Sequence, residues 1–130
     1  MSMNRFNRSE LVARSKTVDR ASILRYAEIT DDFNPIHVDP EFAAATPMRG
    51  IIAHGMLSLN LVWQALKATY GAAAVEAAKL EVRFVRPVRE NDIVTASGRL
   101  STGKDGTYEV AVTNQDGVPV ITGTLTLSTQ

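Results

Sequence analysis

The second half of the chain alternates apolar and polar positions with a period of two. The run at residues 80–84 shows this alternation and ends before Pro87, and three further runs of strand character follow at 93–100, 108–113 and 118–127. Two glycine-containing turns separate the last three runs, Gly103-Lys104-Asp105-Gly106 and Gln115-Asp116-Gly117. Such turns join neighbouring strands into hairpins. The pattern predicts four strands in a consecutive antiparallel meander.

The first half of the chain shows helical spacing after one short strand. Residues 11–18 alternate loosely, and Asp19 then stands where a helix N-cap belongs. An apolar stripe follows at Ile23, Leu24, Ala27 and Ile29. The residue before a proline disfavours helical geometry, so we expect this helix to end ahead of Pro35.

Two more helices are marked by their start signals. Asp39-Pro40-Glu41 supplies an N-cap, a first-position proline and a first-turn acid, and Pro47 closes this short helix. Gly50–Ala53 forms a connector, and the longest helix spans Gly55–Tyr70 before Gly71. Its apolar residues cover most of its circumference, at Met56, Leu57, Leu59, Leu61, Val62, Trp63, Ala65 and Leu66. We expect other structure to wrap such a helix on all sides.

This order of elements predicts an α+β domain whose antiparallel sheet curls around the long helix. We expect residues 1–130 to form one domain, large enough to bury a core without metal or disulfide bonds. Lys and Arg total 14 and balance 14 Asp and Glu, so no global field attracts nucleic acid. The chain has no cysteine, which excludes thiolate nucleophiles and cysteine-ligated metal sites.

No segment of the sequence has the pattern of a leader or a membrane span. Residues 1–8 lack the apolar core of a signal peptide. The most hydrophobic window, residues 51–66, is interrupted by polar residues and falls short of the ~20 apolar residues that cross a bilayer. We therefore expect a cytoplasmic protein with no membrane partner.

The candidate chemistry lies in Asp32-Phe33-Asn34-Pro35-Ile36-His37, where an Asn-Pro turn separates a carboxylate from an imidazole. Proline fixes its own φ, so the turn sets how the two side chains face each other. We expect Asn34 to hold this loop by local hydrogen bonds. Downstream, His54-Gly55 opens the long helix, whose first backbone N–H groups can stabilise a developing negative charge. We interpret His54 itself as a packed, hydrogen-bonded residue.

These motifs resemble those of the MaoC-like (R)-specific enoyl-CoA hydratases. The segments that carry the resemblance are Asp32-Phe33-Asn34-Pro35-Ile36-His37, Asp39-Pro40-Glu41-Phe42-Ala43-Ala44 and His54-Gly55-Met56-Leu57. The resemblance implies the hot-dog fold, a curved antiparallel sheet of about five strands around a long central helix. The chain departs from the family at Asp31, where many members have glycine, and at Trp63, where some have serine.

The resemblance also implies an activity. The enzyme would be a hydro-lyase that converts trans-2-enoyl-CoA to (R)-3-hydroxyacyl-CoA and catalyses the reverse dehydration. Asp32 and His37 would be the catalytic pair, and the Gly55 N–H would bind the thioester oxygen. The remaining substrate contacts are expected at Asn34, Ala53 and Met56. The resemblance implies an acyl-CoA thioester as substrate, no metal or organic cofactor, and a homodimer or higher oligomer.

Three alternatives stay open at this point. A hot-dog acyl-CoA thioesterase would carry its acid on or near the central helix, and residues 56–66 offer no carboxylate. Acyl carrier protein can replace coenzyme A as the thiol carrier, which would make the enzyme an (R)-3-hydroxyacyl-ACP dehydratase. A non-catalytic acyl-CoA-binding protein is disfavoured by the intact Asp32, His37 and Gly55.

Overall fold

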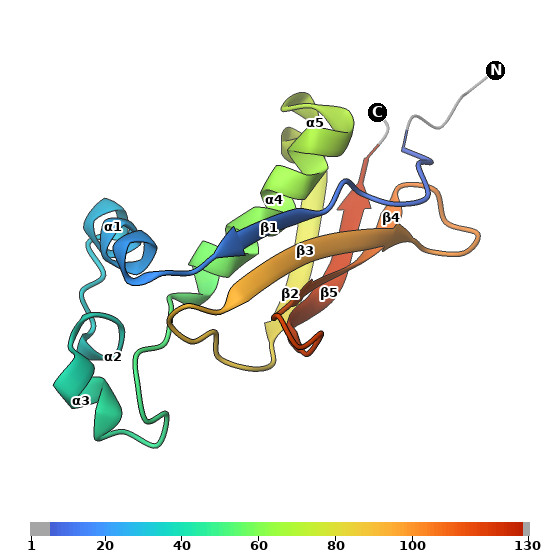
Figure 1. The fold of residues 1–130 in the computed structure, drawn as a ribbon. Helices are drawn as coiled ribbons and strands as arrows, with labels where there is room; N and C mark the ends of the chain where they lie inside the picture. The colour runs from blue at the N-terminus through green and yellow to red at the C-terminus, as the bar shows by residue number, and fades with distance from the viewer. Residues whose placement is uncertain (1–5, 129–130) are drawn as a thin grey trace.

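The computed structural model describes residues 6–128 as a five-stranded antiparallel sheet with one long helix packed on it (Figure 1). The strands are β1 (Arg14–Thr17), β2 (Ala78–Phe84), β3 (Ile93–Leu100), β4 (Thr107–Thr113) and β5 (Pro119–Leu127). The helices are α1 (Arg20–Thr30), α2 (Pro35–Val38), α3 (Pro40–Ala44), α4 (Gly55–Tyr70) and α5 (Ala73–Glu76). The predicted α+β class is confirmed. The one-turn helix α2 was not predicted, because its sequence indicated only a turn.

The strand order differs from the predicted meander. Consecutive hairpins join β3, β4 and β5 as expected, but the order across the sheet is β1-β3-β4-β5-β2. The predicted pairing of β2 with β3 is wrong, because the link at residues 85–92 bonds to other segments. The Val88 carbonyl accepts from the Ala53 N–H at 2.7 Å, and the Asn91 N–H donates to the Val18 carbonyl at 2.7 Å. The link therefore crosses the end of the sheet and does not join β2 to β3 as a hairpin.

Helix α4 packs one face against β1, β3 and β4. Its buried residues recur at helical spacing: Ser58, Leu59, Leu61, Val62, Ala65, Leu66 and Thr69. The opposite face is open, since Met56 is 47 % exposed and Trp63 is half-buried. Within residues 6–128 the sheet covers one side of the helix, so the structure expected to wrap its other face is not supplied by this part of the chain. Burial of each large side chain on the packed face contributes roughly 1.5–3 kcal/mol, which fixes the helix on the sheet.

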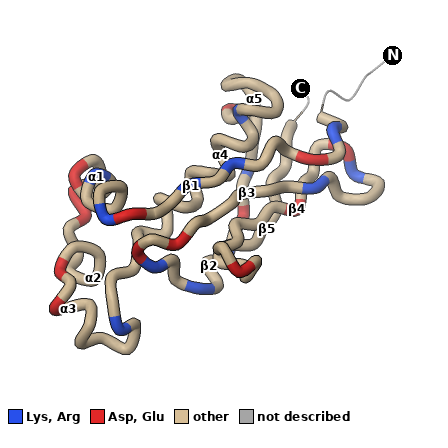
Figure 2. Tube along the Cα trace, in the orientation of Figure 1, with Lys and Arg blue, Asp and Glu red and all other residues tan. Residues whose placement is uncertain are grey.

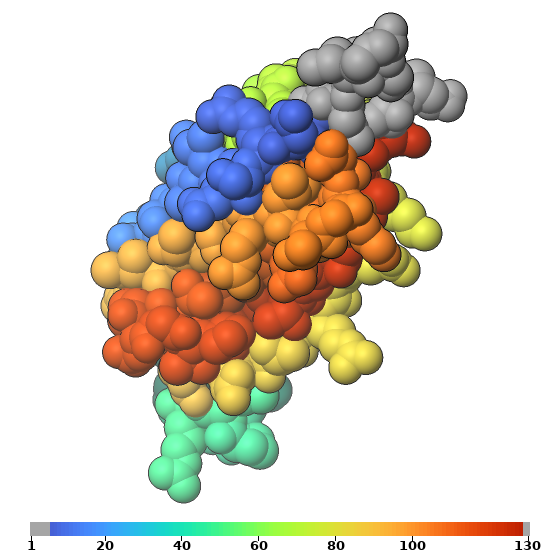
Figure 3. All heavy atoms as spheres, turned by 90° about the vertical axis from the view of Figure 1, so that its right-hand side faces the viewer, coloured from blue at the N-terminus to red at the C-terminus, as the bar shows by residue number. Residues whose placement is uncertain are grey.

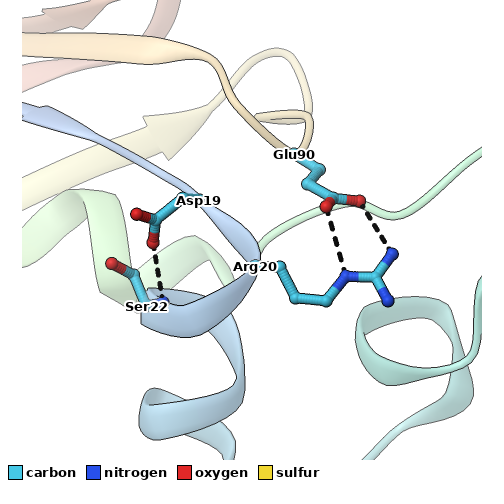
Figure 4. Close-up of polar contacts among 4 residues, drawn as sticks. All are labelled: Asp19, Arg20, Ser22 and Glu90. Atoms are coloured by element: carbon cyan, nitrogen blue, oxygen red, sulfur yellow. Dashed lines mark hydrogen bonds and ion pairs between the residues drawn. The ribbon is translucent and has the colours of Figure 1, made fainter.

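Helix α1 begins at its predicted N-cap. The Asp19 carboxylate accepts a hydrogen bond from the Ser22 N–H at 2.9 Å (Figure 4). Hydrogen bonding by the Ser22 side chain and backbone lowers the pKa of Asp19. The next residue, Arg20, forms an ion pair with Glu90 at 3.2 Å (Figure 4). This pair ties the start of α1 to the link between β2 and β3.

Helices α1, α2 and α3 extend beyond one end of the sheet (Figure 1). Figure 3 shows the segment that contains α3 projecting past the strands at the lower end of the molecule. Along the trace of residues 6–128, basic and acidic residues are interspersed and form no long run of one sign (Figure 2). No helix in this described range is both long and apolar enough to cross a membrane.

Two hydrogen-bonded tyrosines, Tyr70 and Tyr108, hold the segment before β1 at the other end of α4. The Tyr108 side chain is fully buried, and its hydroxyl donates to the Arg8 carbonyl at 2.6 Å. The Tyr70 hydroxyl accepts from the Arg8 N–H at 2.9 Å and lies 2.5 Å from the Tyr108 hydroxyl. Burial, followed by the hydrogen bond with Tyr70, raises the pKa of Tyr108.

Tyr108→Phe is expected to lower the free energy of unfolding by about 1–3 kcal/mol, because the Arg8 carbonyl loses its buried donor. In the wild type, Tyr108 ionises near its ordinary pKa of 10.0 only in the unfolded chain. Its contribution to the free energy of unfolding is therefore complete below that pH and is lost as the pH rises above it, because ionisation then favours the unfolded chain. The difference between wild type and variant should therefore shrink at high pH. Urea denaturation at about pH 8 and above pH 10 measures both effects. An equal difference at the two pH values would contradict this role of Tyr108.

Candidate active site

The loop after α1 is shaped by short-range hydrogen bonds. Asp31 ends the helix in the left-handed conformation, with φ 56° and ψ 34°, which glycine, Asn and Asp adopt more readily than other residues. The Asp32 carboxylate accepts from the Asn34 N–H at 3.3 Å, and the Asn34 side chain accepts from the Ile36 N–H at 3.1 Å. Asn34 therefore caps α2, and Pro35 fills the first helical position. The predicted local hydrogen bonding of Asn34 is confirmed.

His37 lies on α2 and is held by one main-chain contact. Its Nδ1 lies 2.7 Å from the carbonyl oxygen of Ile52. A carbonyl oxygen only accepts hydrogen bonds, so Nδ1 must carry the proton and donate. In the neutral imidazole, Nε2 then keeps a lone pair that can accept a proton. The connector before α4 thus selects the tautomer of His37.

His54 joins the loop to the start of α4. Its Nε2 donates to the Asp32 carbonyl at 2.9 Å, and its ring stacks on His37 with centroids 3.9 Å apart and planes at 28°. Tyr26 contacts the same ring edge-on at a centroid distance of 5.0 Å. The prediction of a packed, hydrogen-bonded histidine is correct for Nε2. It is wrong for Nδ1, which is buried without a hydrogen bond to any part of residues 6–128.

The side chains of Asp32, His37 and His54 converge. One carboxylate oxygen and one ring nitrogen of each histidine all lie within 4.8 Å of one another. This spacing allows one water molecule to sit between Asp32 and His37. The same three side chains suit a metal ion less well. The two stacked rings direct their in-plane lone pairs side by side, and His54 Nε2 already donates a hydrogen bond to a carbonyl. The cluster therefore fits acid/base chemistry.

A cavity of about 360 Å³ opens beside His37. Its other lining residues are Met48, Ile52, Ala53, Gly55, Ser58, Phe84, Val85, Arg86, Pro87, Val88 and Ile121. Apolar walls with a few polar groups are typical of small-molecule sites, and here His37, Ser58 and Arg86 supply the polar side chains. A larger hollow of about 530 Å³ lies over β3, β4 and β5, but its lining contains no histidine.

Backbone contacts build one wall of this cavity from two segments distant in sequence. Ile52 forms an isolated antiparallel bridge with Arg89, and the Ala53 N–H donates to the Val88 carbonyl at 2.7 Å. The Arg89 guanidinium also donates to the Met48 carbonyl at 2.5 Å. The connector before α4 and the link after β2 therefore form one surface behind His37.

Gly55 is the first residue of α4, so its N–H has no partner inside the helix and lies at the positive end of the helix dipole. A Cβ atom built on Gly55 would lie 2.8 Å from Cε2 of Phe84. Glycine thus lets the Phe84 ring lie close against the start of the helix. Sequence reasoning did not identify Phe84 as part of the site. The one sequence feature that marks Phe84 is its place at the end of an alternating run, shortly before Pro87.

The three residues predicted to contact substrate lie in different places. Ala53 is 6 % exposed and lines the cavity together with His37. Asn34 is exposed, and its side chain caps α2. Met56 is 47 % exposed and is not among the lining residues. The structure therefore brings Ala53 into the cavity and leaves Asn34 and Met56 at the surface.

Comparisons with known proteins agree with this geometry. Residues 4–122 match the model of the MaoC like domain family. The chain is 30% identical over 113 residues to an (R)-specific enoyl-CoA hydratase of Aeromonas caviae, and the match covers 84% of each chain. It is 35% identical over 79 residues to a 3-hydroxybutyryl-CoA dehydratase of Methylorubrum extorquens, covering 61% of this chain but only half (50%) of that enzyme's length.

The fold is similar to that of the (R)-hydratase from A. caviae involved in PHA biosynthesis. The TM-score is 0.80 at 26% sequence identity, and the match covers 97% of this chain and 100% of that one. The resemblance inferred from the motifs is confirmed, and so is the hot-dog fold.

We expect the chain's two histidines to adopt opposite tautomers in their neutral forms. His37 should carry its proton on Nδ1, which donates to Ile52, and His54 should carry its proton on Nε2, which donates to Asp32. Long-range ¹H–¹⁵N NMR spectra of the neutral rings distinguish the two forms, and His54→Gln assigns the signals. The same tautomer at both positions would contradict the geometry of the site.

Proposed function

This chain belongs to the MaoC-like domain family, and on that premise we propose that it is a hydro-lyase acting on acyl thioesters. It hydrates trans-2-enoyl-CoA to (R)-3-hydroxyacyl-CoA and catalyses the reverse dehydration. The observation that carries this proposal is the convergence of Asp32 and His37 beside an apolar cavity that also receives the N-terminal end of α4.

Asp32 and His37 act together on one water molecule. Hydration joins the water oxygen to C3 of the substrate, and the π electrons of the C2=C3 bond move to C2. Asp32 is the base that removes a proton from the water, while Nε2 of His37 orients the same water and handles the proton exchanged with C2. The proton on Asp32 then passes to the unprotonated Nε2 of His37, which delivers it to C2, so both side chains return to their starting forms.

The N–H of Gly55 stabilises the charge that develops on the thioester oxygen. It belongs to the first residue of a 16-residue helix, where the backbone N–H groups and the helix dipole favour negative charge. Loss of such a donor typically costs about 2.7–4 kcal/mol of transition-state stabilisation. Glycine also keeps a side chain away from this end of the helix, where the Phe84 ring lies 2.8 Å from the position that a Cβ atom would take.

The cavity holds the acyl chain. Its walls are mostly apolar, and Ala53 lines it together with His37 and Gly55. Asn34 and Met56 lie at the surface and complete the substrate contacts when the coenzyme A part of the substrate is bound. Coenzyme A is the proposed thiol carrier, with acyl carrier protein as the alternative.

A thioesterase is the main rival activity, since it uses the same substrates and the same type of helix start. Its general base or nucleophile is expected on or near the central helix, but the first turn of α4 contains no acidic residue. The carboxylate of this site lies instead on the loop after α1. This placement favours addition of water at C3 over attack on the thioester carbon.

The enzyme is also proposed to be a homodimer in the cytoplasm. β2 forms one edge of the sheet, α4 has an open face, and Phe84 and Val85 are 51 % and 42 % exposed at the end of that strand. A second copy paired along β2 would cover these apolar groups. Light scattering during size-exclusion chromatography should give the mass of two chains. A monomer at all concentrations would contradict the dimer.

An assay with crotonyl-CoA and a longer trans-2-enoyl-CoA tests the reaction. We expect loss of the conjugated thioester absorbance, formation of the (R)-3-hydroxyacyl product and no release of free thiol. Hydrolysis of saturated acyl-CoA to free thiol would favour a thioesterase. Activity confined to the enoyl-ACP would assign the carrier-protein alternative, and binding without turnover would assign a non-catalytic protein.

Asp32→Asn and His37→Gln should each lower kcat by at least about a hundredfold, because each removes a proton-transfer group. Asp31→Asn is the matched control, since Asn tolerates the same left-handed conformation and the substitution leaves Asp32 and His37 in place. Circular dichroism should show intact folds for all three. Wild-type turnover in both site variants would refute the mechanism.

A further inference from the structure

Ser58 is a buried residue whose hydroxyl has no hydrogen-bond partner. The residue is 1 % exposed, and within residues 6–128 the buried side-chain atoms that lack a partner are Ser58 Oγ and His54 Nδ1. Buried polar atoms are normally paired, because an unpaired one carries its desolvation cost without compensation. An unpaired hydroxyl that lines a cavity indicates a partner supplied by a ligand.

The helix itself does not satisfy this hydroxyl. Other hydroxyls on helices of this protein donate to the carbonyl four residues earlier: Thr69 donates to Ala65 and Thr30 to Tyr26, each at 2.7 Å. Ser58 makes no such bond. The hydroxyl is therefore unpaired, in contrast to that of Thr69 on the same helix, and it belongs to a residue that lines the cavity.

The position of Ser58 relative to Gly55 is specific. The two residues are three positions apart at the start of α4, so they lie on the same face of the helix, and both line the cavity beside His37. Helical side chains lean toward the N-terminus, which carries the Ser58 hydroxyl toward the Gly55 end of the helix. An oxygen bound to the Gly55 N–H would thus face a second donor.

We infer that the Ser58 hydroxyl is a second hydrogen-bond donor to the thioester oxygen, alongside the Gly55 N–H. The inference rests on the proposed acyl-thioester function and adds a residue to it. Two donors on one oxygen are the usual form of an oxyanion site, and a donor already in place requires no reorganisation during the reaction. The uncompensated burial of the hydroxyl in the free protein is the cost of that arrangement.

Ser58→Ala tests the inference, because function and stability should change in opposite directions. The variant loses a donor, so kcat should fall about a hundredfold. It also loses an unpaired buried hydroxyl and gains a better helix former, so Tm should stay the same or rise. A hydroxyl with a structural role would instead give a lower Tm and an unchanged kcat.

Thr69→Val is the matched control. It removes a buried hydroxyl from the other end of α4, where Thr69 donates to Ala65 and accepts from the Val12 N–H at 2.8 Å. This variant should lose several degrees of Tm and keep the wild-type kcat. Comparison of the two variants therefore distinguishes a hydroxyl that stabilises the fold from one that binds the substrate.

Isotope-edited infrared spectra of bound butyryl-CoA, labelled with ¹³C at the thioester carbonyl, give a readout without turnover. We expect the carbonyl stretch in the wild type to lie at lower frequency than in Ser58→Ala. A wild type that hydrates crotonyl-CoA, together with Ser58→Ala at wild-type kcat and carbonyl frequency, would overturn the role of Ser58 and leave the proposed function standing. A wild type without hydratase activity would reject the function, and the infrared shift would still test the hydrogen bond.

Discussion

The packing of α4 on one face of the sheet is the constraint from which the rest of the site follows. Its buried side chains fix the helix at Leu61, Val62, Ala65 and Leu66, all at most 2 % exposed. The first turn extends to the end of the sheet where α1, α2 and α3 lie, and its residues Gly55 and Ser58 line a cavity there. Apolar burial thus positions a polar helix end, because the hydrophobic effect sets where the helix lies and its dipole sets what that end can bind.

The acid/base pair is held by main-chain carbonyls. His37 donates from Nδ1 to Ile52, and His54 donates from Nε2 to Asp32, so each ring presents its other nitrogen as an acceptor. The stacked rings then restrict each other's rotation. Both carbonyls belong to segments that meet at the start of α4, so these contacts hold the two rings in place although most residues of the site lie on loops and one-turn helices.

Buried polar groups have hydrogen-bond partners at the C-terminal end of α4 but lack them at its N-terminal end. At its C-terminal end, Tyr70 and Tyr108 exchange hydrogen bonds with the backbone of Arg8, and Thr69 is paired on both sides. At its N-terminal end, His54 Nδ1 and Ser58 Oγ lie buried without partners among residues 6–128. Unpaired polar groups lower stability, so their concentration beside the acid/base pair is the pattern expected when substrate binding, and not folding alone, has shaped that end.

Several features follow from the sequence alone because they depend on neighbouring residues: the caps at Asp19 and Asp39, the extent of α4, the hairpins of β3, β4 and β5, and the proximity of Asp32 to His37. Each of these follows from hydrogen bonds or backbone restrictions that span a few residues. Only the tertiary structure decided the place of β2 beside β5, the open face of α4, the tautomers of the two histidines and the position of Phe84 over Gly55. These depend on contacts between segments 15 or more residues apart, such as His37 with Ile52, whose formation is governed by packing of the whole chain and leaves no local pattern in the sequence.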